Sequence, residues 1–327
     1  MLTPFAIIPM KTHTPYNSRL PSCAFLAVLL GFVSAALCMI PAASPGGQIF
    51  VVNDGNGTIG EYTTSGATIN ASLVTGLNLP SGIALSGGNL FVVNSGNGTI
   101  GEYTTSGATV NSALISGLNN PSRIAVSGGL LFVTNRSGNT IGEYTTSGAT
   151  VNSSLVTGLN TPTGIAVSGG NLFVANGASG TIGEYTTSGA TVNSTLISGL
   201  NFPLGIHLSG GNLFVVNGGG TNGPIGEYTT SGAPINPALI SMGLNFPGDI
   251  AFSGTDLFVT NENNGTIGEY TTSGATVNPA LISGLNFPVG IAIASSVPDA
   301  SATSILLLLG VGATFGLNLL LHKRSEA

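Results

Sequence analysis

The chain has 327 residues, of which 50 are glycine, and its formal net charge at pH 7 is −6. Only 6% of the residues are charged, against about 25% in a typical soluble protein, but apolar residues recur at fixed positions, which excludes a disordered chain. Residues 48–294 contain two bases, Arg123 and Arg136, against ten acids, and because such a surface repels phosphate backbones we expect no nucleic-acid partner.

The first 43 residues have the order of a secretory signal. Lys11 and Arg19 precede an apolar run from Ala24 to Ile40, and small residues follow that run. A charged start, an apolar centre and a small-residue cleavage region together mark a segment that signal peptidase removes. We therefore predict a signal peptide at 1–43, with a retained membrane anchor as the alternative. Two starts and two cleavage sites stay open: Met1 or Met10, and after Ala35 or Ala43.

The segment IGEYTTSG occurs six times between residues 59 and 274, and its glutamate recurs every 41 to 43 residues. The six glutamates are Glu61, Glu102, Glu143, Glu184, Glu227 and Glu269. A fixed period of this length indicates a repeat architecture. Gly-Gly and Ser-Gly turns divide each unit into short strands. In the second unit, four strands are predicted at 82–85, 89–94, 99–105 and, around SALISG, 112–117.

Four antiparallel strands in a unit of about 42 residues are typical of a β-propeller blade. A β-solenoid is the alternative, but its rungs are shorter. The first unit starts at its second strand, 48–53, and the last unit stops after its first strand, 290–294. Pairing of these two strands would close a ring and cover two exposed edges. The sequence therefore predicts an all-β, six-bladed β-propeller of four-stranded blades over 48–294, with helical segments at the chain ends.

Each unit also resembles the NHL repeat and the related repeats of virginiamycin B lyase-type propellers. Proline, GIAV, GNLFV and TIGEY follow one another in the NHL order over residues 48–294. The NHL repeat usually has aspartate after the aromatic strand, where all six units here have asparagine: Asn53, Asn94, Asn135, Asn176, Asn217 and Asn261. The resemblance implies the propeller fold. Lyase-type chemistry implies a histidine with a nearby acid, and only His207 could supply that histidine.

The repeated glutamate is predicted to be structural. It lies in the third strand, two strand spacings of about 4.8 Å outside the innermost strand, and hence roughly 15 Å from the ring axis. Neighbouring copies would be about as far apart, beyond a Debye length of about 8–10 Å, so they cannot share a central ion. An unpaired buried carboxylate costs several kcal/mol. We therefore expect each glutamate to tie adjacent blades together through Thr, Ser or backbone N–H groups.

A ligand site is expected where the units differ from one another. They differ in the loop after the second strand and in the connection between blades, which emerge on the same face of a propeller. On the innermost strand, the residue before the shared isoleucine is glycine in four units but Arg123 and Asp249 in the others. These two are three blades apart and therefore oppose each other across the channel. His207 replaces the alanine that follows that isoleucine.

Two interpretations of Arg123, His207 and Asp249 stay open: drift at exposed positions, or a site for a small polar or anionic ligand at the channel mouth. No residue is assigned as catalytic, because one histidine between the end segments cannot form a three-histidine metal site. No metal or cofactor is predicted at the core of the ring. Calcium bound by the loop at Glu262, Asn263 and Asn264 is the open alternative.

The C-terminal residues 297–327 have the features of a sorting signal. Val297, Pro298 and Asp299 precede an apolar run at 304–321, and His322, Lys323 and Arg324 follow it as a basic end. The run of 18 is close to the shortest length that spans a membrane. This order resembles the PEP-CTERM sorting signal, especially its VPDSG-type variant. The resemblance implies a transmembrane helix at 304–321, export, and processing by an exosortase-like protease.

The sequence therefore favours an exported propeller at the outer cell surface or in the extracellular matrix. We expect a non-enzymatic binding or adhesion module, with a glycan or a cell-surface protein as ligand and an association with extracellular polysaccharide. The alternative is a hydrolase or lyase, lactonase-like or virginiamycin B lyase-like, with its site at the channel mouth. A lactonase-type calcium site needs several inner acids, and Asp249 is the only acid on an innermost strand.

Overall fold

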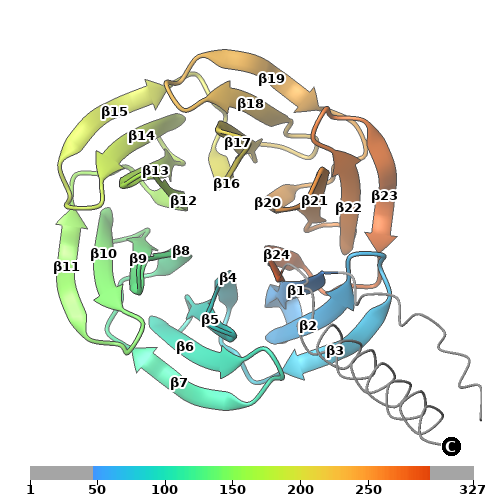
Figure 1. Cartoon of the computed structure of the whole chain (residues 1–327), viewed down its shortest axis with the longest axis horizontal. Helices are drawn as coiled ribbons and strands as arrows, with labels where there is room; N and C mark the ends of the chain where they lie inside the picture. Colours follow the sequence, from blue (N-terminus) through green and yellow to red (C-terminus); the bar gives the residue numbers. More distant parts are fainter. Residues whose placement is uncertain (1–46, 295–327) are drawn as a thin grey trace, which may run out of the picture. The chain divides into compact units, whose positions relative to one another are not determined.

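The computed structural model describes residues 47–294, which form a ring of six four-stranded antiparallel sheets around a central channel (Figure 1). This confirms the predicted six-bladed β-propeller. The predicted signal peptide at 1–43 and the predicted sorting signal at 297–327 lie outside the described residues. Within 47–294, no helix is long and apolar enough to span a membrane.

The strands fall into four concentric sets, and one short 3-10 helix, η1, covers Asp54–Asn56. The innermost strands are β4 (Pro80–Ser86), β8 (Pro121–Ser127), β12 (Pro162–Ser168), β16 (Pro203–Ser209), β20 (Pro247–Ser253) and β24 (Pro288–Ala294). The second strands are β1 (Gln48–Asn53), β5 (Asn89–Asn94), β9 (Leu130–Asn135), β13 (Asn171–Asn176), β17 (Asn212–Asn217) and β21 (Asp256–Asn261). The third strands are β2 (Thr58–Thr63), β6 (Thr99–Thr104), β10 (Thr140–Thr145), β14 (Thr181–Thr186), β18 (Ile225–Thr229) and β22 (Thr266–Thr271). The outer strands are β3 (Thr68–Val74), β7 (Thr109–Ile115), β11 (Thr150–Val156), β15 (Thr191–Ile197), β19 (Pro234–Ile240) and β23 (Thr276–Ile282).

We number the blades by chain order: blade 1 is β4–β7, blade 2 β8–β11, blade 3 β12–β15, blade 4 β16–β19 and blade 5 β20–β23. Blade 6 combines the first three strands of the described residues with the last one, in the order β24-β1-β2-β3. Strand β24 pairs antiparallel with β1, with Gln48 opposite Ala294 and Val52 opposite Gly290. This is the predicted closure, and it covers the edges that β1 and β24 would otherwise expose.

Three of the four predicted strands of blade 1 agree closely with the structure. The fourth differs, because β7 begins at Thr109 and ends at Ile115, whereas the prediction was 112–117. Its first five residues are exposed, so that strand has no apolar alternation from which its start could be read. Pairing with β6 defines it instead, and the register shifts on both sides of Glu102 show that β7 is bulged.

Each apolar core lies between two neighbouring blades. Between blades 6 and 1, for example, Phe50 and Ile59 of one blade pack with Leu90 and Tyr103 of the other. Along a third strand, isoleucine and tyrosine therefore face opposite neighbours, because side chains alternate across a strand. The glycine between them is also required: a Cβ at Gly101 would lie 2.7 Å from the Tyr103 ring, two residues further along the strand. The invariant segment IGEY thus serves packing on both faces of each blade.

The repeated glutamate hydrogen-bonds inside its own blade. In four blades one carboxylate oxygen accepts from an amide at the start of the second strand, at 2.7–2.8 Å. The pairs are Gln48–Glu61, Asn89–Glu102, Asn171–Glu184 and Asn212–Glu227. These partners differ from the prediction, which placed Thr, Ser or backbone N–H groups of a neighbouring blade there. The amide and the glutamate are diagonal neighbours on one face of a strand pair, close enough for a hydrogen bond.

Two blades lack this amide. Leu130 takes its place in blade 2 and Asp256 takes its place in blade 5. Burial raises the pKa of Glu269, and the negative charge of Asp256 adds to that rise. The structural role of the glutamate stays a prediction, but the two exceptional blades provide an internal comparison for testing it.

The outer strands are exposed edges, and an asparagine satisfies part of each edge. In every blade its side-chain oxygen accepts the backbone N–H two residues later, at 3.1–3.3 Å. The six asparagines are Asn70, Asn111, Asn152, Asn193, Asn236 and Asn278. Bulges and occupied N–H groups make an edge a poor template for pairing with another chain. These asparagines therefore protect a ring that has few charges on its rim.

We expect Glu102→Ala to destabilise the protein more than Glu143→Ala does. The first change leaves the half-buried Asn89 amide without its acceptor, whereas Leu130 at the equivalent place in blade 2 loses no hydrogen bond. An unsatisfied donor costs about 1–3 kcal/mol when buried, so a difference of about 1 kcal/mol is expected at this half-buried site. Urea unfolding of both variants measures it, and equal losses would contradict the role of the amide.

Candidate functional site

The face of the ring where the units differ is built on six copies of one backbone frame. Each innermost strand begins with a proline. In every blade, the backbone N–H of the residue directly after the second strand donates to the carbonyl of the residue before that proline, at 3.0–3.2 Å. We call this hydrogen-bonded pair the frame of the blade. The six pairs are Asp54–Phe287, Ser95–Leu79, Arg136–Asn120, Gly177–Thr161, Gly218–Phe202 and Glu262–Phe246. The backbone geometry is therefore constant, while the side chains that it carries differ from blade to blade.

The acceptor residue of each frame has left-handed backbone, with φ between 45° and 56°. The six residues are Leu79, Asn120, Thr161, Phe202, Phe246 and Phe287. Residues other than glycine rarely adopt such angles, and for a β-branched residue such as Thr161 they are unfavourable. Backbone strain of this kind persists only where the surroundings enforce it, and it is common at binding sites. All six strained positions lie in the connections that border the channel mouth.

A cavity of about 330 Å³ opens on this face, and we call it the upper basin. Its lining includes the charged side chains of Asp54, Arg136 and Glu262 and the rings of Phe202 and Phe246. All five belong to the frames described above, and Arg123 lies at its floor. The volume falls within the range of about 300–1,000 Å³ that is usual for small-molecule sites.

The basin carries opposite charges on different blades. Arg136 is in blade 2, and its guanidinium carbon lies 5.5 Å from the centre of the Phe202 ring, which is a cation–π distance. Glu262 is in blade 5, and Asp54 is in the adjacent blade 6. Burial raises the pKa of Glu262 to about 7; Arg123 opposes the rise, and the charges of Asp54 and Asp249 add to it. Burial also raises the pKa of Asp54.

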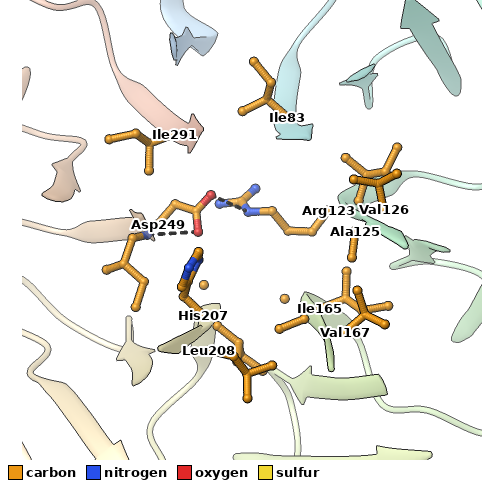
Figure 2. A pocket seen from close by; sticks show the side chains of 16 residues that line it. Ile83, Arg123, Ala125, Val126, Ile165, Val167, His207, Leu208, Asp249 and Ile291 are labelled. Atoms are coloured by element: carbon orange, nitrogen blue, oxygen red, sulfur yellow. Dashed lines mark hydrogen bonds and ion pairs between the residues drawn. The ribbon is translucent and has the colours of Figure 1, made fainter. Parts of the chain in front are cut away.

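Below the basin, Arg123 and Asp249 meet across the channel (Figure 2). Arg123 Nε lies 3.6 Å from Asp249 Oδ2, and each side chain is 13% exposed. The guanidinium also donates to the backbone carbonyl oxygens of three other strands: Ser81, Gly248 and Val289. A single side chain of blade 2 thus contacts blades 1, 5 and 6, so we call this arrangement the channel brace.

Each member of the brace is supported by a threonine on the strand behind it. Thr134 Oγ1 accepts from the backbone N–H of Arg123 at 2.9 Å, and Thr260 Oγ1 accepts from that of Asp249 at 2.8 Å. The other four blades have valine or alanine at this place. Gly205 of blade 4 leaves room for the carboxylate, because a Cβ there would lie 2.5 Å from Asp249 Oδ1. The two charges therefore come with matched changes around them.

On the other side of the brace lies a chamber of about 230 Å³, walled by branched aliphatic side chains and containing His207 (Figure 2). The imidazole stacks on Phe252 at 4.9 Å between ring centres, with an interplanar angle of 27°. Burial lowers the pKa of His207 to about 4, so the imidazole is neutral at pH 7. His207 is thus packed against the Phe252 ring, and the acid of the channel, Asp249, is already paired with Arg123.

The three predicted channel residues all line this lower chamber, and the prediction that Arg123 and Asp249 oppose each other agrees with the structure. Sequence reasoning did not foresee that Arg123 and Asp249 form an ion pair, in which each charge is neutralised by the other. It also missed Arg136, Asp54 and the phenylalanines of the upper basin. The loops could have indicated these residues, because the residue that follows the shared asparagine differs in charge or size between most units.

In the predicted calcium loop, Glu262 and Asn264 have different surroundings. The side-chain oxygen of Asn264 accepts from Thr266 Oγ1 at 3.0 Å, as Asn97 does from Thr99 in blade 1, while Glu262 lines the basin. Over residues 47–294, no group of three or more His, Cys, Asp or Glu side chains is arranged to hold a metal ion. Calcium at this loop stays a prediction.

Comparisons with known proteins give the fold. No family model matches the chain, and no curated protein matches it. A chain from a crystal structure of a nidogen/laminin complex is similar with a TM-score of 0.62 and 17% identity, over 77% of this chain and 99% of that one. A protein of unknown function from Bacteroides caccae gives a TM-score of 0.60 and 15% identity, over 76% and 99%. At these identities the likeness supports the β-propeller fold.

The channel brace predicts a strong coupling between its two charges. Arg123→Gly and Asp249→Gly each introduce the residue that the other blades have, and each leaves one buried charge without its partner. Loss of one partner of a buried pair costs about 3–5 kcal/mol. The double variant is expected to lose clearly less than the sum of the two single losses, as measured by thermal unfolding in a double-mutant cycle. Additive losses would show that the two charges do not stabilise each other.

Because the pKa of Glu262 is raised, we predict that the stability of the fold depends on pH. Its pKa is raised from 4.5 to about 7, so below pH 4.5 it is protonated in the folded and the unfolded chain alike. Between pH 4.5 and 7 the unfolded chain releases the proton first, which lowers the stability of the fold by up to about 3 kcal/mol. Glu262→Gln should therefore match the wild type near pH 4 and exceed its melting temperature at pH 8. Equal melting temperatures at both pH values would contradict the burial of this carboxyl group.

Proposed function

We propose that the chain is an exported cell-surface β-propeller that acts as a non-enzymatic binding module, with a glycan bound in the upper basin. The observation that carries the proposal is the contrast between constant backbone and variable side chains. Six equivalent frames hold strained residues at one end of the channel, and three of them place charged side chains in a common cavity. Packing requires none of this variation, whereas recognition of a particular ligand does.

A saccharide suits the chemistry of the basin. Phe246 lines the basin and is exposed, so the C–H face of a sugar can pack on its ring. Charged groups at the rim, Arg136 and Glu262, can exchange hydrogen bonds with hydroxyl groups. A cell-surface protein loop is the other ligand that we considered, but a cavity of this size takes a small unit better than a broad protein surface.

Export is supported by the two ends of the sequence. The segment at 1–43 has the order of a secretory signal, and residues 297–327 resemble a PEP-CTERM signal, which implies processing by signal peptidase and an exosortase-like protease. The NHL-like order of the repeat supports a binding propeller of the same broad kind. Together these features favour a location at the outer cell surface or in extracellular polysaccharide.

A hydrolase or lyase has less support. A histidine-based mechanism needs an acid that orients or charges the imidazole, but His207 stacks on Phe252 and Asp249 pairs with Arg123. The acids of the upper basin lie on the other side of the channel brace. Binding without catalysis is therefore the function that the geometry favours.

The proposal is tested with the full chain in a Gram-negative bacterium that has an exosortase and secretes polysaccharide. We expect antibody to label the wild-type protein on intact cells, and the protein to sediment with the extracellular polysaccharide. The Arg136→Gln/Glu262→Gln double variant should reach the surface equally but remain in the supernatant. Asp256→Asn, at the opposite end of β21 from Glu262, should behave as wild type.

Two outcomes would contradict the proposal separately. Protein found only inside the cells would contradict export. Undiminished sedimentation of the double variant would contradict a glycan site in the upper basin, even if export is correct.

A further inference from the structure

The charges of the upper basin are divided between two walls. Blade 2 supplies Arg136, and the blades on the other side of the ring, 5 and 6, supply Glu262 and Asp54. Over residues 47–294, Arg123 and Asp249 form the single ion pair. The three basin charges therefore share a cavity without pairing with one another.

The negative wall is short of positive charge. One carboxylate oxygen of Asp54, Oδ1, is buried and has no hydrogen-bond partner within the described part of the chain. The charge of Asp54 acts on Glu262 from the adjacent blade, and like charges in a partly buried site destabilise each other. Arg123 compensates only in part, because its guanidinium donates to four backbone carbonyl groups and pairs with Asp249. A cation beside the two acids would relieve both costs, and it would favour the ionised form of Glu262, whose pKa is raised to about 7.

The positive wall consists of the Arg136 guanidinium, which could bind an anion. Arg136 lies over the Phe202 ring, and its guanidinium donates no hydrogen bond to any side chain or carbonyl among residues 47–294. The equivalent frame position of the next blade is Gly177, which has no side chain that could compete for the guanidinium. A planar guanidinium with free N–H groups is well suited to a carboxylate.

We propose, resting on the function proposed above, that the upper basin recognises a zwitterionic saccharide unit, with its ammonium group between Asp54 and Glu262 and its carboxylate at Arg136. The sugar ring then spans the basin beside Phe202 and Phe246. A ligand with only a negative charge would meet two acids, and a ligand with only a positive charge would leave Arg136 unpaired. Opposite charges on one small unit satisfy both walls at once.

Three related sugars separate these cases. Muramic acid has both an amino group and a carboxylate, N-acetylmuramic acid keeps only the carboxylate, and glucosamine keeps only the amino group. With the full chain in mild detergent at pH 7, ligand-observed NMR titration should give an affinity for muramic acid about tenfold higher than for either relative. Equal affinities for muramic acid and one of its relatives would overturn the proposal.

Variants assign each charge to its wall. Glu262→Gln should remove the preference for muramic acid over N-acetylmuramic acid, and Arg136→Gln should remove its preference over glucosamine. Both substitutions keep the size of the side chain nearly constant or reduce it modestly, and far-ultraviolet circular dichroism will show whether each variant is folded. The matched control is Asp256→Asn, which removes an acid from the same blade outside the basin and should keep both preferences.

The result also separates this inference from the function on which it rests. If the wild-type protein sediments with polysaccharide through the basin but shows no preference for muramic acid, the ligand class is wrong and the binding function stands. If the basin variants change neither sedimentation nor sugar binding, both proposals are wrong.

Discussion

The structure depends on the burial of both faces of every blade against its neighbours. No blade has a core of its own: each of the six apolar clusters joins residues of two adjacent blades. A blade at the end of an open array would expose one face, with a large loss of hydrophobic stabilisation. The pairing of β24 with β1 completes blade 6 and so lets it cover the free faces of blades 1 and 5, which turns a row of blades into a ring without ends (Figure 1).

This constraint explains where the sequence can vary. Residues on the two buried faces repeat almost without change, as IGEY does, because each contacts both its own blade and the next one. Exceptions inside the channel come in matched sets: Arg123 with Thr134, and Asp249 with Thr260. His207 likewise faces Phe252, which stands where other blades have a smaller aliphatic residue. The loops at the channel mouth vary one by one, because there the constant backbone frame leaves the side chains unconstrained by packing.

Repetition made the fold predictable from the sequence, because every turn and strand could be compared in six copies. The blade number, the shared blade and the opposition of Arg123 and Asp249 all follow from counting units. The partner of the repeated glutamate did not follow, since a diagonal contact with Asn89 depends on strand register and side-chain direction. The basin was missed for a related reason: Arg136 and Glu262 are far apart in sequence, and their loops meet at one cavity only in the folded ring.

The two arginines of residues 48–294 are both in blade 2, and they have different surroundings. Arg123 is enclosed by backbone carbonyl groups and Asp249, so its charge is used within the fold. Arg136 is above it, on a loop, and the acids opposite are Glu262 and Asp54. Because the brace already contains one acid and one base, it adds little net charge to the floor of the basin. The electrostatic character of the basin is then set by its walls, and a ligand that binds as proposed would be oriented along the axis from blade 2 to blades 5 and 6.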